Sequence, residues 1–251
     1  MVTKTTTTAQ KSVSSTVSDH MKIVAIGDVH GCVKQLVDII ERPEITGDEL
    51  ILLGDLFDRS PFFNGDSLTL ALVRLMQEQP QEFGFNKVTV LRGNHEDAII
   101  RSIEQGPESS IYDLWQYNGG DAEFYETIRD SKPTLEWLKS LPLYVIRGDY
   151  MFVHGGVRPD VPLEEQTEQD LLWIREEFHD AEDHGLPYTV VHGHTPVPQI
   201  DVAHKRINLD TGSFFSGNLS FMEFEYVESM GSEAGEVRQT NDRDCECAHA
   251  V

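Results

Sequence analysis

Cysteine is scarce in this chain of 251 residues, which contains only Cys32, Cys245 and Cys247. Three cysteines do not make the disulfide framework of a small secreted protein. The N-terminal segment also lacks the apolar stretch of a secretory signal, so we expect a cytoplasmic protein. Two of the cysteines lie near His249 in an acidic C-terminal segment, which is only a weak signal for a metal site.

Basic residues and long hydrophobic runs are scarce as well. No stretch approaches the roughly 20 apolar residues that cross a bilayer. Lysine and arginine together number 20 against 43 acidic residues, which leaves a net charge of −23. Nucleic acids and anionic membranes both bind clustered cations, so we expect neither as a partner. A small anionic substrate remains compatible with this charge, because bound divalent cations can reverse its sign inside an acidic site.

The chain does contain apolar, β-branched segments that alternate with stretches of helical periodicity, which is typical of an α/β protein. The predicted strands are residues 22–26, 50–53, 87–91, 143–146, 150–153, 188–191, 206–209 and 219–225, and the clearest predicted helices begin at residue 33 and span 68–79. Residues 97–140 are polar and aromatic, and they predict a helical insertion. We place one catalytic domain at 21–227, between a disordered Ser/Thr-rich tail (1–20) and an acidic flexible tail (228–251).

Five of the predicted strands end in Asp, Asn or His beside glycine. These ends are GDVHG (27–31), GDLFDR (54–59), RGNHE (92–96), HGG (154–156) and HGHT (192–195). One such end is ordinary turn chemistry. Five of them predict a single site, built from loops that meet at one edge of a sheet.

The residue types at these strand ends indicate a metal site. Carboxylate, amide and imidazole ligands without a thiolate suit Mn²⁺, Fe or Zn²⁺ better than copper or an iron–sulfur cluster. The set is too large for one ion, which suggests two ions that share a carboxylate. Such centres activate water and stabilise the attacking and leaving oxygens of a displacement, so they indicate phosphoester hydrolysis.

In this order, the five motifs resemble the phosphoprotein phosphatase branch of the calcineurin-like metallophosphoesterases, over about residues 21–225. The segments HGGVRPDVPLEEQ and DLLWIREEF are similar to the bacterial and phage-type serine/threonine protein phosphatases of that branch. The resemblance implies an α/β fold with a β-sandwich core flanked by helices (α-β-β-α). It also implies a dinuclear metal site at strand ends, most simply with two Mn²⁺ ions.

The resemblance also implies roles for individual residues. The metal ligands would be Asp28, His30, Asp55, Asn94, His154 and His194, with Asp55 shared by both ions. His95 would protonate the leaving alkoxide, and Asp58 would orient His95 and hold its charge. Arg59, Arg175 and Asn94 would bind phosphoryl oxygens, a task that suits the rigid guanidinium fork.

Several nearby residues have structural interpretations. We expect His192 to support the site rather than to bind metal, and Arg158 to be structural. Arg175 has the alternative of pairing with a neighbouring acid such as Glu176. Asp210 ends a strand, so it serves either turn formation or the support of a ligand histidine.

The sequence therefore predicts a metal-dependent serine/threonine phosphoprotein phosphatase, in which a metal-bridging hydroxide attacks a phosphorylated protein or peptide directly. The alternatives are a symmetrical diadenosine tetraphosphate hydrolase, a phosphotyrosine-directed phosphatase of the same fold, and a non-catalytic phosphoprotein-binding module. A cysteine-based phosphatase is excluded, because the position six residues after Cys32 holds Asp38 rather than arginine. No eukaryotic-type regulatory subunit is expected, since the glycine-rich C-terminal loop that would bind one is not recognisable.

Overall fold

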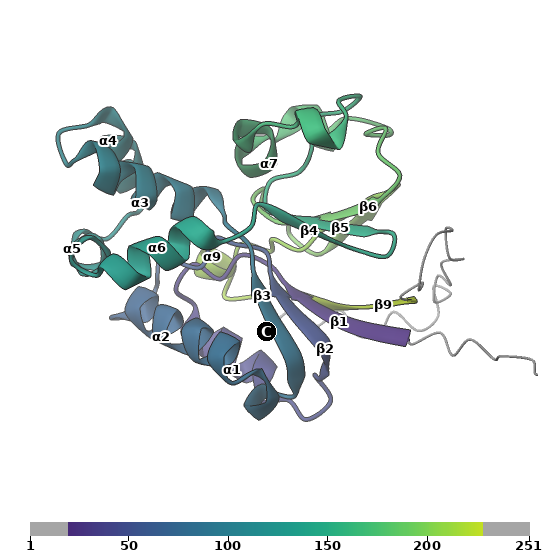
Figure 1. Ribbon diagram of the computed structural model, residues 1–251, viewed down its shortest axis with the longest axis horizontal. Coiled ribbons are helices and arrows are strands. Elements are labelled where there is room, and N and C mark those ends of the chain that lie inside the picture. Colours follow the sequence, from purple (N-terminus) through teal and green to yellow (C-terminus); the bar gives the residue numbers. More distant parts are fainter. Residues whose placement is uncertain (1–19, 228–251) are drawn as a thin grey trace, which may run out of the picture.

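The computed structural model describes residues 20–227 (Figure 1), so the two predicted tails lie outside the described residues, apart from His20. The strands are β1 (His20–Ile26), β2 (Gly47–Leu52), β3 (Phe85–Val90), β4 (Tyr144–Arg147), β5 (Tyr150–Val153), β6 (Thr189–His192), β7 (Asp201–Ala203), β8 (Arg206–Asn208) and β9 (Phe221–Val227). The α-helices are α1 (Val33–Ile40), α2 (Gly65–Glu78), α3 (Asn94–Gln105), α4 (Ser110–Tyr117), α5 (Ala122–Asp130), α6 (Lys132–Ser140), α7 (Glu168–Trp173), α8 (Glu176–His179) and α9 (Ser213–Ser216). Short 3₁₀ turns cover Pro80–Phe83 and Leu163–Glu165. Within these described helices, none is long and apolar enough to cross a membrane.

The strands form two sheets. The first has four strands in the order β3-β2-β1-β9, with β1, β2 and β3 parallel and β9 antiparallel to β1. The second has five strands in the order β4-β5-β6-β8-β7, with a parallel centre of β5, β6 and β8 and an antiparallel strand at each edge. The parallel strands of each sheet therefore end on one side, where their loops meet.

Side-chain alternation along the strands builds three apolar cores, because successive residues of a strand point to opposite faces of its sheet. In β1, Ile23 and Ala25 pack between the two sheets, whereas Val24 and Ile26 pack in the core that includes residues of α1 and α2. In β5, Met151 contributes to a third core, on the outer side of the second sheet with residues of α7 and α8. Figure 1 shows α1 and α2 on one side of the sandwich and α7 on the other. The predicted α-β-β-α fold is confirmed.

All eight predicted strands are present, with ends that differ by up to three residues. The prediction missed β7, which has three residues and pairs antiparallel with β8. Two of its three residues are exposed, so no apolar alternation marks the strand. Helix α2 begins three residues before its predicted start, at Gly65.

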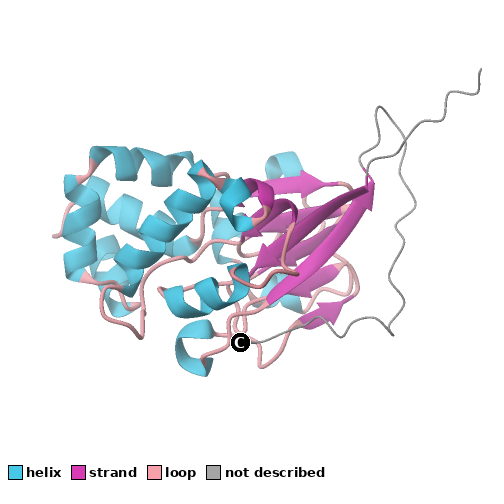
Figure 2. Ribbon diagram, turned by 90° about the horizontal axis from the view of Figure 1, so that it is seen from below, coloured by secondary structure: helices cyan, strands magenta, loops and turns pink. Residues whose placement is uncertain are grey.

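Helices α3 to α6 form the segment where a helical insertion was predicted, from Asn94 to Ser140. In Figure 2 the strands lie together on one side of the molecule and most helices on the other. The segment is anchored by buried aromatic residues. The ring of Phe124 lies 4.9 Å from that of Phe57 in the loop after β2, and Trp115 is fully buried. The helices thus share a core with a loop that carries site residues.

Candidate active site at the strand ends

The predicted site residues converge where the parallel strands end, although some lie more than 160 residues apart in the chain. They follow β1, β2, β3, β5 and β6, at Asp28, His30, Asp55, Asn94, His95, His154 and His194. Each of these side chains is at most 5% exposed. Burial of an ionised group costs free energy unless an opposite charge or a hydrogen bond compensates it. The carboxylates of this cluster therefore require a positively charged partner.

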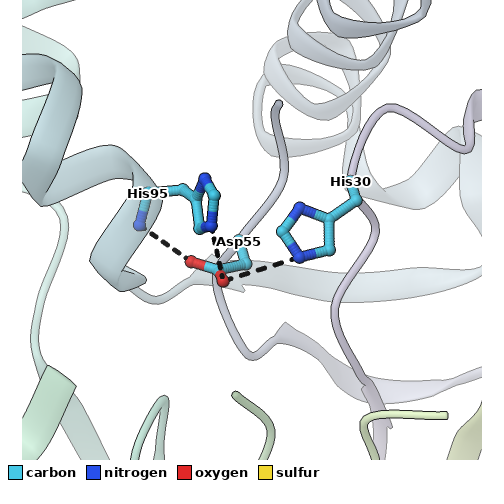
Figure 3. A group of neighbouring side chains, drawn as sticks. All are labelled: His30, Asp55 and His95. Carbon is cyan, nitrogen blue, oxygen red and sulfur yellow. Dashed lines mark hydrogen bonds and ion pairs between the residues drawn. The ribbon is translucent and has the colours of Figure 1, made fainter. Parts of the chain in front are cut away.

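Two groups of potential metal ligands share the Asp55 carboxylate. In the first, the ligand atoms of His30, Asp55 and His95 lie within 4.8 Å of one another (Figure 3). Asp55 Oδ2 is 3.7 Å from His30 Nε2 and 3.9 Å from His95 Nε2. In the second, the ligand atoms of Asp55, His154 and His194 lie within the same limit, and Asp55 Oδ1 is 3.3 Å from His154 Nε2. Asp55 therefore occupies the position of the carboxylate predicted to be shared.

The hydrogen bonds of two histidines show that these groups fit divalent cations. Nδ1 of His30 lies 2.9 Å from the Phe57 carbonyl, and Nδ1 of His154 lies 3.0 Å from the Leu53 carbonyl. Each carbonyl accepts a hydrogen bond from the Nδ1–H group, which leaves a lone pair on each Nε2. Burial lowers the pKa of both rings, to about 3 for His30, so both are neutral at neutral pH.

The lone pair of His154 faces an oxygen acceptor, whereas that of His30 has the Asp55 carboxylate at 3.7 Å and an N–H of Arg59 at 3.4 Å. His154 Nε2 is 2.8 Å from Asn94 Oδ1, which is also 2.7 Å from His194 Nδ1. A divalent cation held between these nitrogen and oxygen atoms would remove the repulsion, and the donor set is one that Mn²⁺, Fe and Zn²⁺ accept. The residues thus fit the metals that the sequence predicted.

A His–Asp pair lies beside the first group. His95 Nδ1 is 2.7 Å from Asp58 Oδ2, and the same oxygen accepts a 2.8 Å hydrogen bond from the indole of Trp115. Burial opposes protonation of His95, but the charges of Asp55 and Asp58 raise its pKa above the ordinary value. The pair is the one that the sequence predicted. Trp115 was missed, because it lies 57 residues from Asp58 and no motif connects them.

Five residues at the strand ends hold a left-handed backbone, which costs energy for residues other than glycine. They are His30, Asp55, Asp58, Arg59 and His194, with φ between 47° and 69°. Such strain persists only where surrounding contacts impose it, and it concentrates at functional sites. The left-handed backbone turns these side chains toward the site, whereas a strand would place alternate side chains on opposite faces.

Two glycines allow the backbone to approach the site carboxylates. A Cβ atom on Gly93 would lie 2.2 Å from Asp55 Oδ1, and one on Gly193 would lie 2.0 Å from Asp28 Oδ1. The Asp28 carboxylate also accepts the backbone N–H of His194, with its two oxygens at 3.2 and 3.1 Å. The carboxylates are thus held by backbone that only glycine permits to come so close.

Glu96 is a supporting residue that the sequence interpretation left without a role. It is fully buried, and its carboxylate accepts backbone N–H groups of Asp55 at 2.9 Å, Leu56 at 2.8 Å and Gly93 at 2.8 Å. Burial and the nearby Asp55 charge raise its pKa to about 7. A signal existed: a Glu three residues after a helix N-cap is the capping-box pattern. Glu96 joins the loop after β2 to the start of α3.

The two predicted phosphate-binding arginines lie at the edge of the site without acidic partners. Arg59 Nη1 is 3.4 Å from His30 Nε2, and its Nε donates to the Asn118 carbonyl at 2.8 Å. Arg175 Nη1 donates to the His194 carbonyl at 2.9 Å and to Thr195 Oγ1 at 3.2 Å. Among residues 20–227 neither arginine forms an ion pair, so the alternative pairing of Arg175 with a neighbouring acid is not observed.

The remaining candidates lie outside both groups. The His192 ring packs against the ring of Phe178, with the centroids 5.0 Å apart. Arg158 pairs with Asp170, where Nη2 lies 2.6 Å from Oδ1. Asp210 accepts the backbone N–H of Gly212 at 2.9 Å, as expected of a turn residue.

The profile of the calcineurin-like phosphoesterase family matches residues 21–227. The chain belongs to this family. Membership implies divalent metal ions, and the two groups around Asp55 fit them.

Two curated relatives are both named as nucleotide hydrolases. A bis(5′-nucleosyl)-tetraphosphatase PrpE, named as asymmetrical, from Halalkalibacterium halodurans is 25% identical over 83% of this chain and 92% of its own length. A bis(5′-nucleosyl)-tetraphosphatase from Dechloromonas aromatica, named as symmetrical, is 32% identical over 55% of this chain and 45% of its own length.

Solved structures share the fold. One, provisionally described as a diadenosine tetraphosphatase, has a TM-score of 0.55 and 23% identity over 86% of this chain and 96% of that one. A cold-active protein-tyrosine phosphatase of a Shewanella species has a TM-score of 0.56 and 17% identity over 80% of this chain and 75% of that one. At these identities the structures show the fold alone, which serves several kinds of phosphoester.

The prediction of a serine/threonine phosphoprotein phosphatase, with a phosphorylated protein or peptide as substrate, was wrong. The curated relatives that span most of the chain are named as tetraphosphatases, which hydrolyse phosphoric anhydrides. The physical reason is that the five motifs indicate binding of metal ions and of a phosphoryl group, and a phosphoryl group is common to anhydrides and monoesters. The groups that distinguish the two substrates lie around the motifs.

Proposed function

We propose that this chain is a metal-dependent hydrolase that cleaves the phosphoanhydride chain of a dinucleoside tetraphosphate. The observation that carries the proposal is the match to relatives of that name over 82–84% of this chain and 91–93% of theirs. The geometry supports it, because two groups of potential metal ligands share one buried carboxylate, and a guanidinium group contacts a histidine of each group: Arg59 contacts His30 and Arg175 contacts His194.

The proposed ligands of two divalent cations, with Mn²⁺ as the first candidate, are Asp28, His30, Asp55, Asn94, His154 and His194. Such ions, when bound, lower the pKa of water and neutralise phosphoryl charge. Asp28 additionally fixes the loop after β6, since its carboxylate accepts the N–H of His194. Glu96 fixes the loop after β2 in the same way.

Arg59 and Arg175 orient the phosphate chain in this proposal. Both guanidinium groups lack an acidic partner within the described residues, so their remaining N–H donors are available to phosphoryl oxygens. They also matter electrostatically, because the net charge of −23 opposes the approach of a polyphosphate and cations at the site offset that repulsion locally.

His95 holds the proton that the leaving oxygen takes up. Asp58 orients the His95 ring through the 2.7 Å contact at Nδ1. In an anhydride the departing oxygen belongs to a phosphate and is stable as an anion. In an alkyl phosphomonoester it is an alkoxide, which needs a proton. His95 therefore contributes less to anhydride cleavage than to cleavage of a monoester.

The direction of cleavage follows from the coverage of the relatives. The chain spans 91–93% of the relatives named as asymmetrical but 45% of the symmetrical one. We therefore propose asymmetrical cleavage, which releases ATP and AMP from diadenosine tetraphosphate.

The test is to incubate the full chain and Mn²⁺ with diadenosine tetraphosphate or with a phosphoserine peptide, and to separate the nucleotides by chromatography. We expect ATP and AMP in equal amounts, no turnover after EDTA treatment, and no turnover by an Asp55→Asn variant. ADP as the only product would show symmetrical cleavage. A larger kcat/KM for the peptide than for the dinucleotide would refute the proposed function.

A further inference from the structure

A cavity of about 380 Å³ lies beside the proposed metal ligands. Its walls are residues 59, 60 and 62–67, in the loop before α2 and the first turn of α2, and residues within 119–127, before and in α5. Arg59 belongs to this wall, and its Nη1 atom is 3.4 Å from Nε2 of His30. None of the six proposed ligands lines the cavity. A molecule inside it would therefore place one end at Arg59, next to the metal site, and extend the rest away from the site.

One wall of this cavity carries exposed aromatic rings. Phe63 is 89% exposed and Phe62 is 37% exposed, although both belong to a loop that lines a cavity. Apolar rings left in water favour the stacking of another flat group on their faces. Phe63 is too exposed for core packing to explain why this position holds an aromatic residue.

Carboxylates supply the acidic part of the wall, beside the uncharged polar residues Ser60, Asn64, Ser67 and Thr127. Asp66, Asp121 and Glu123 line the cavity together with the single arginine. Asp66 is 6% exposed, and within the described residues its Oδ1 atom has no hydrogen-bond partner. One oxygen of Asp121 accepts the backbone N–H of Phe124 at 2.7 Å, which leaves its other oxygen.

These groups select the chemistry of an occupant. Carboxylates repel phosphate but accept hydrogen bonds from hydroxyl and amino groups. An occupant that suits the cavity is therefore flat, uncharged and rich in hydrogen-bond donors, and it is joined to a phosphate that lies at Arg59. A nucleoside 5′-phosphate fits, because its base is flat, its base and sugar carry hydrogen-bond donors, and its phosphate would lie at Arg59. A further length of polyphosphate would offer only the phosphate.

We propose that this cavity is a nucleoside subsite, in which Phe63 stacks on the base of the substrate while Asp66 and its neighbouring carboxylates accept hydrogen bonds from the sugar or base. The assignment rests on the proposed function for the identity of the whole substrate. It adds the element that distinguishes a dinucleotide from a simple phosphoester. The phosphate next to the bound nucleoside lies at Arg59.

The first test compares Phe63→Ala with Phe63→Trp, because Phe63 is exposed and neither change disturbs the core. Stacking of a base on an aromatic ring corresponds to roughly a five-fold or greater change in affinity. In Phe63→Ala we expect the ratio of kcat/KM for diadenosine tetraphosphate to that for p-nitrophenyl phosphate to fall at least that much, mainly through KM. Phe63→Trp should keep the ratio. Val202→Ala, at a 62% exposed apolar residue of β7, is the control for loss of exposed apolar surface.

The second test does not depend on turnover. Saturation-transfer NMR with adenosine, which has no phosphate, should show binding to the wild-type chain that is weakened in Phe63→Ala and retained in Phe63→Trp. An unchanged kcat/KM ratio in Phe63→Ala, or adenosine that fails to bind the wild-type chain, would overturn the subsite. If adenosine binds as expected but the wild-type chain leaves diadenosine tetraphosphate intact, the proposed function fails and the nucleoside subsite stands.

Discussion

Replacing Trp115 with phenylalanine tests whether the helical segment positions the catalytic pair. Trp115 belongs to α4 and is fully buried, and its indole N–H donates to Asp58 Oδ2 at 2.8 Å. Among the described residues the other oxygen of Asp58 has no hydrogen-bond partner. The side-chain contacts that hold this carboxylate are therefore those with Trp115 and His95.

The expected loss of stability in Trp115→Phe follows from these contacts. A hydrogen bond to a charged group contributes about 1.5–3 kcal/mol to stability, and the smaller ring leaves a void that adds a cost of the same sign. The matched control is Trp137→Phe in α6, whose indole donates to the neutral amide oxygen of Gln77, also at 2.8 Å. A neutral hydrogen bond contributes about 0.5–1.5 kcal/mol, and Trp137 is only half-buried. We therefore expect a free energy of unfolding lowered by about 2–4 kcal/mol in Trp115→Phe and by about 1 kcal/mol in Trp137→Phe.

Two measurements check this reasoning. Urea denaturation gives the two free energies, and steady-state kinetics with an alkyl phosphomonoester, whose leaving alkoxide needs a proton, gives kcat. Because Asp58 loses its fixed orientation, kcat should fall by about ten-fold in Trp115→Phe, which corresponds to about 1.4 kcal/mol of barrier, and should stay at the wild-type value in Trp137→Phe. Equal kcat values in the two variants would refute the positioning role of Trp115, whatever their stabilities.

Three further changes are informative. In His95→Asn, kcat for an alkyl phosphomonoester should fall by about 10²–10⁴ and by less for diadenosine tetraphosphate, while elemental analysis finds nearly unchanged metal content; loss of both metals would make His95 a ligand instead. Gly193→Ala should reduce bound metal and lower stability by about 1–3 kcal/mol, because the new Cβ would lie 2.0 Å from Asp28 Oδ1; full metal content in a correctly folded variant would contradict the close approach. Burial opposes ionisation of Glu49, but the hydrogen bonds from Arg147 and its neighbours lower its pKa below the ordinary value of 4.5. The stabilisation from ionised Glu49 is therefore complete above pH 4.5 and is lost as the pH falls through the lowered pKa. Urea denaturation at several pH values should show a smaller loss in Glu49→Gln than in the wild type.

The sheets and the convergence of the motifs were predictable for a local reason. Short apolar runs that are rich in valine, isoleucine and leucine indicate buried strands, and parallel strands end on one side of a sheet. Asp28 and Asp55 therefore had to lie near each other once their runs were recognised as neighbouring parallel strands. His154 follows β5 of the second sheet, so the packing of the two sheets brings it to them. The short β7 had no such pattern, and it exists because it pairs with β8.

Other parts of the candidate site depend on contacts between segments that are distant in the chain. The bond from Trp115 to Asp58 and the three N–H groups gathered by Glu96 join helices to loops, and no spacing in the sequence encodes them. Glu96 did carry a capping-box signal, but the signal indicates a helix start and not a partner. The cavity beside Arg59 arises in the same way, from a loop and a helix about 60 residues apart.

By itself, the sequence determined the α/β fold, the order of the strands along the chain and the residue types that gather at their ends. Those features follow from periodicity and from ligand chemistry, which are properties of short segments. Only the tertiary structure decided that Trp115 donates to Asp58, that Arg59 and Arg175 lack acidic partners among the described residues, and that an aromatic and acidic cavity adjoins the site. Those features depend on which distant segments pack together, and the same motifs surrounded by other segments serve other phosphoesters.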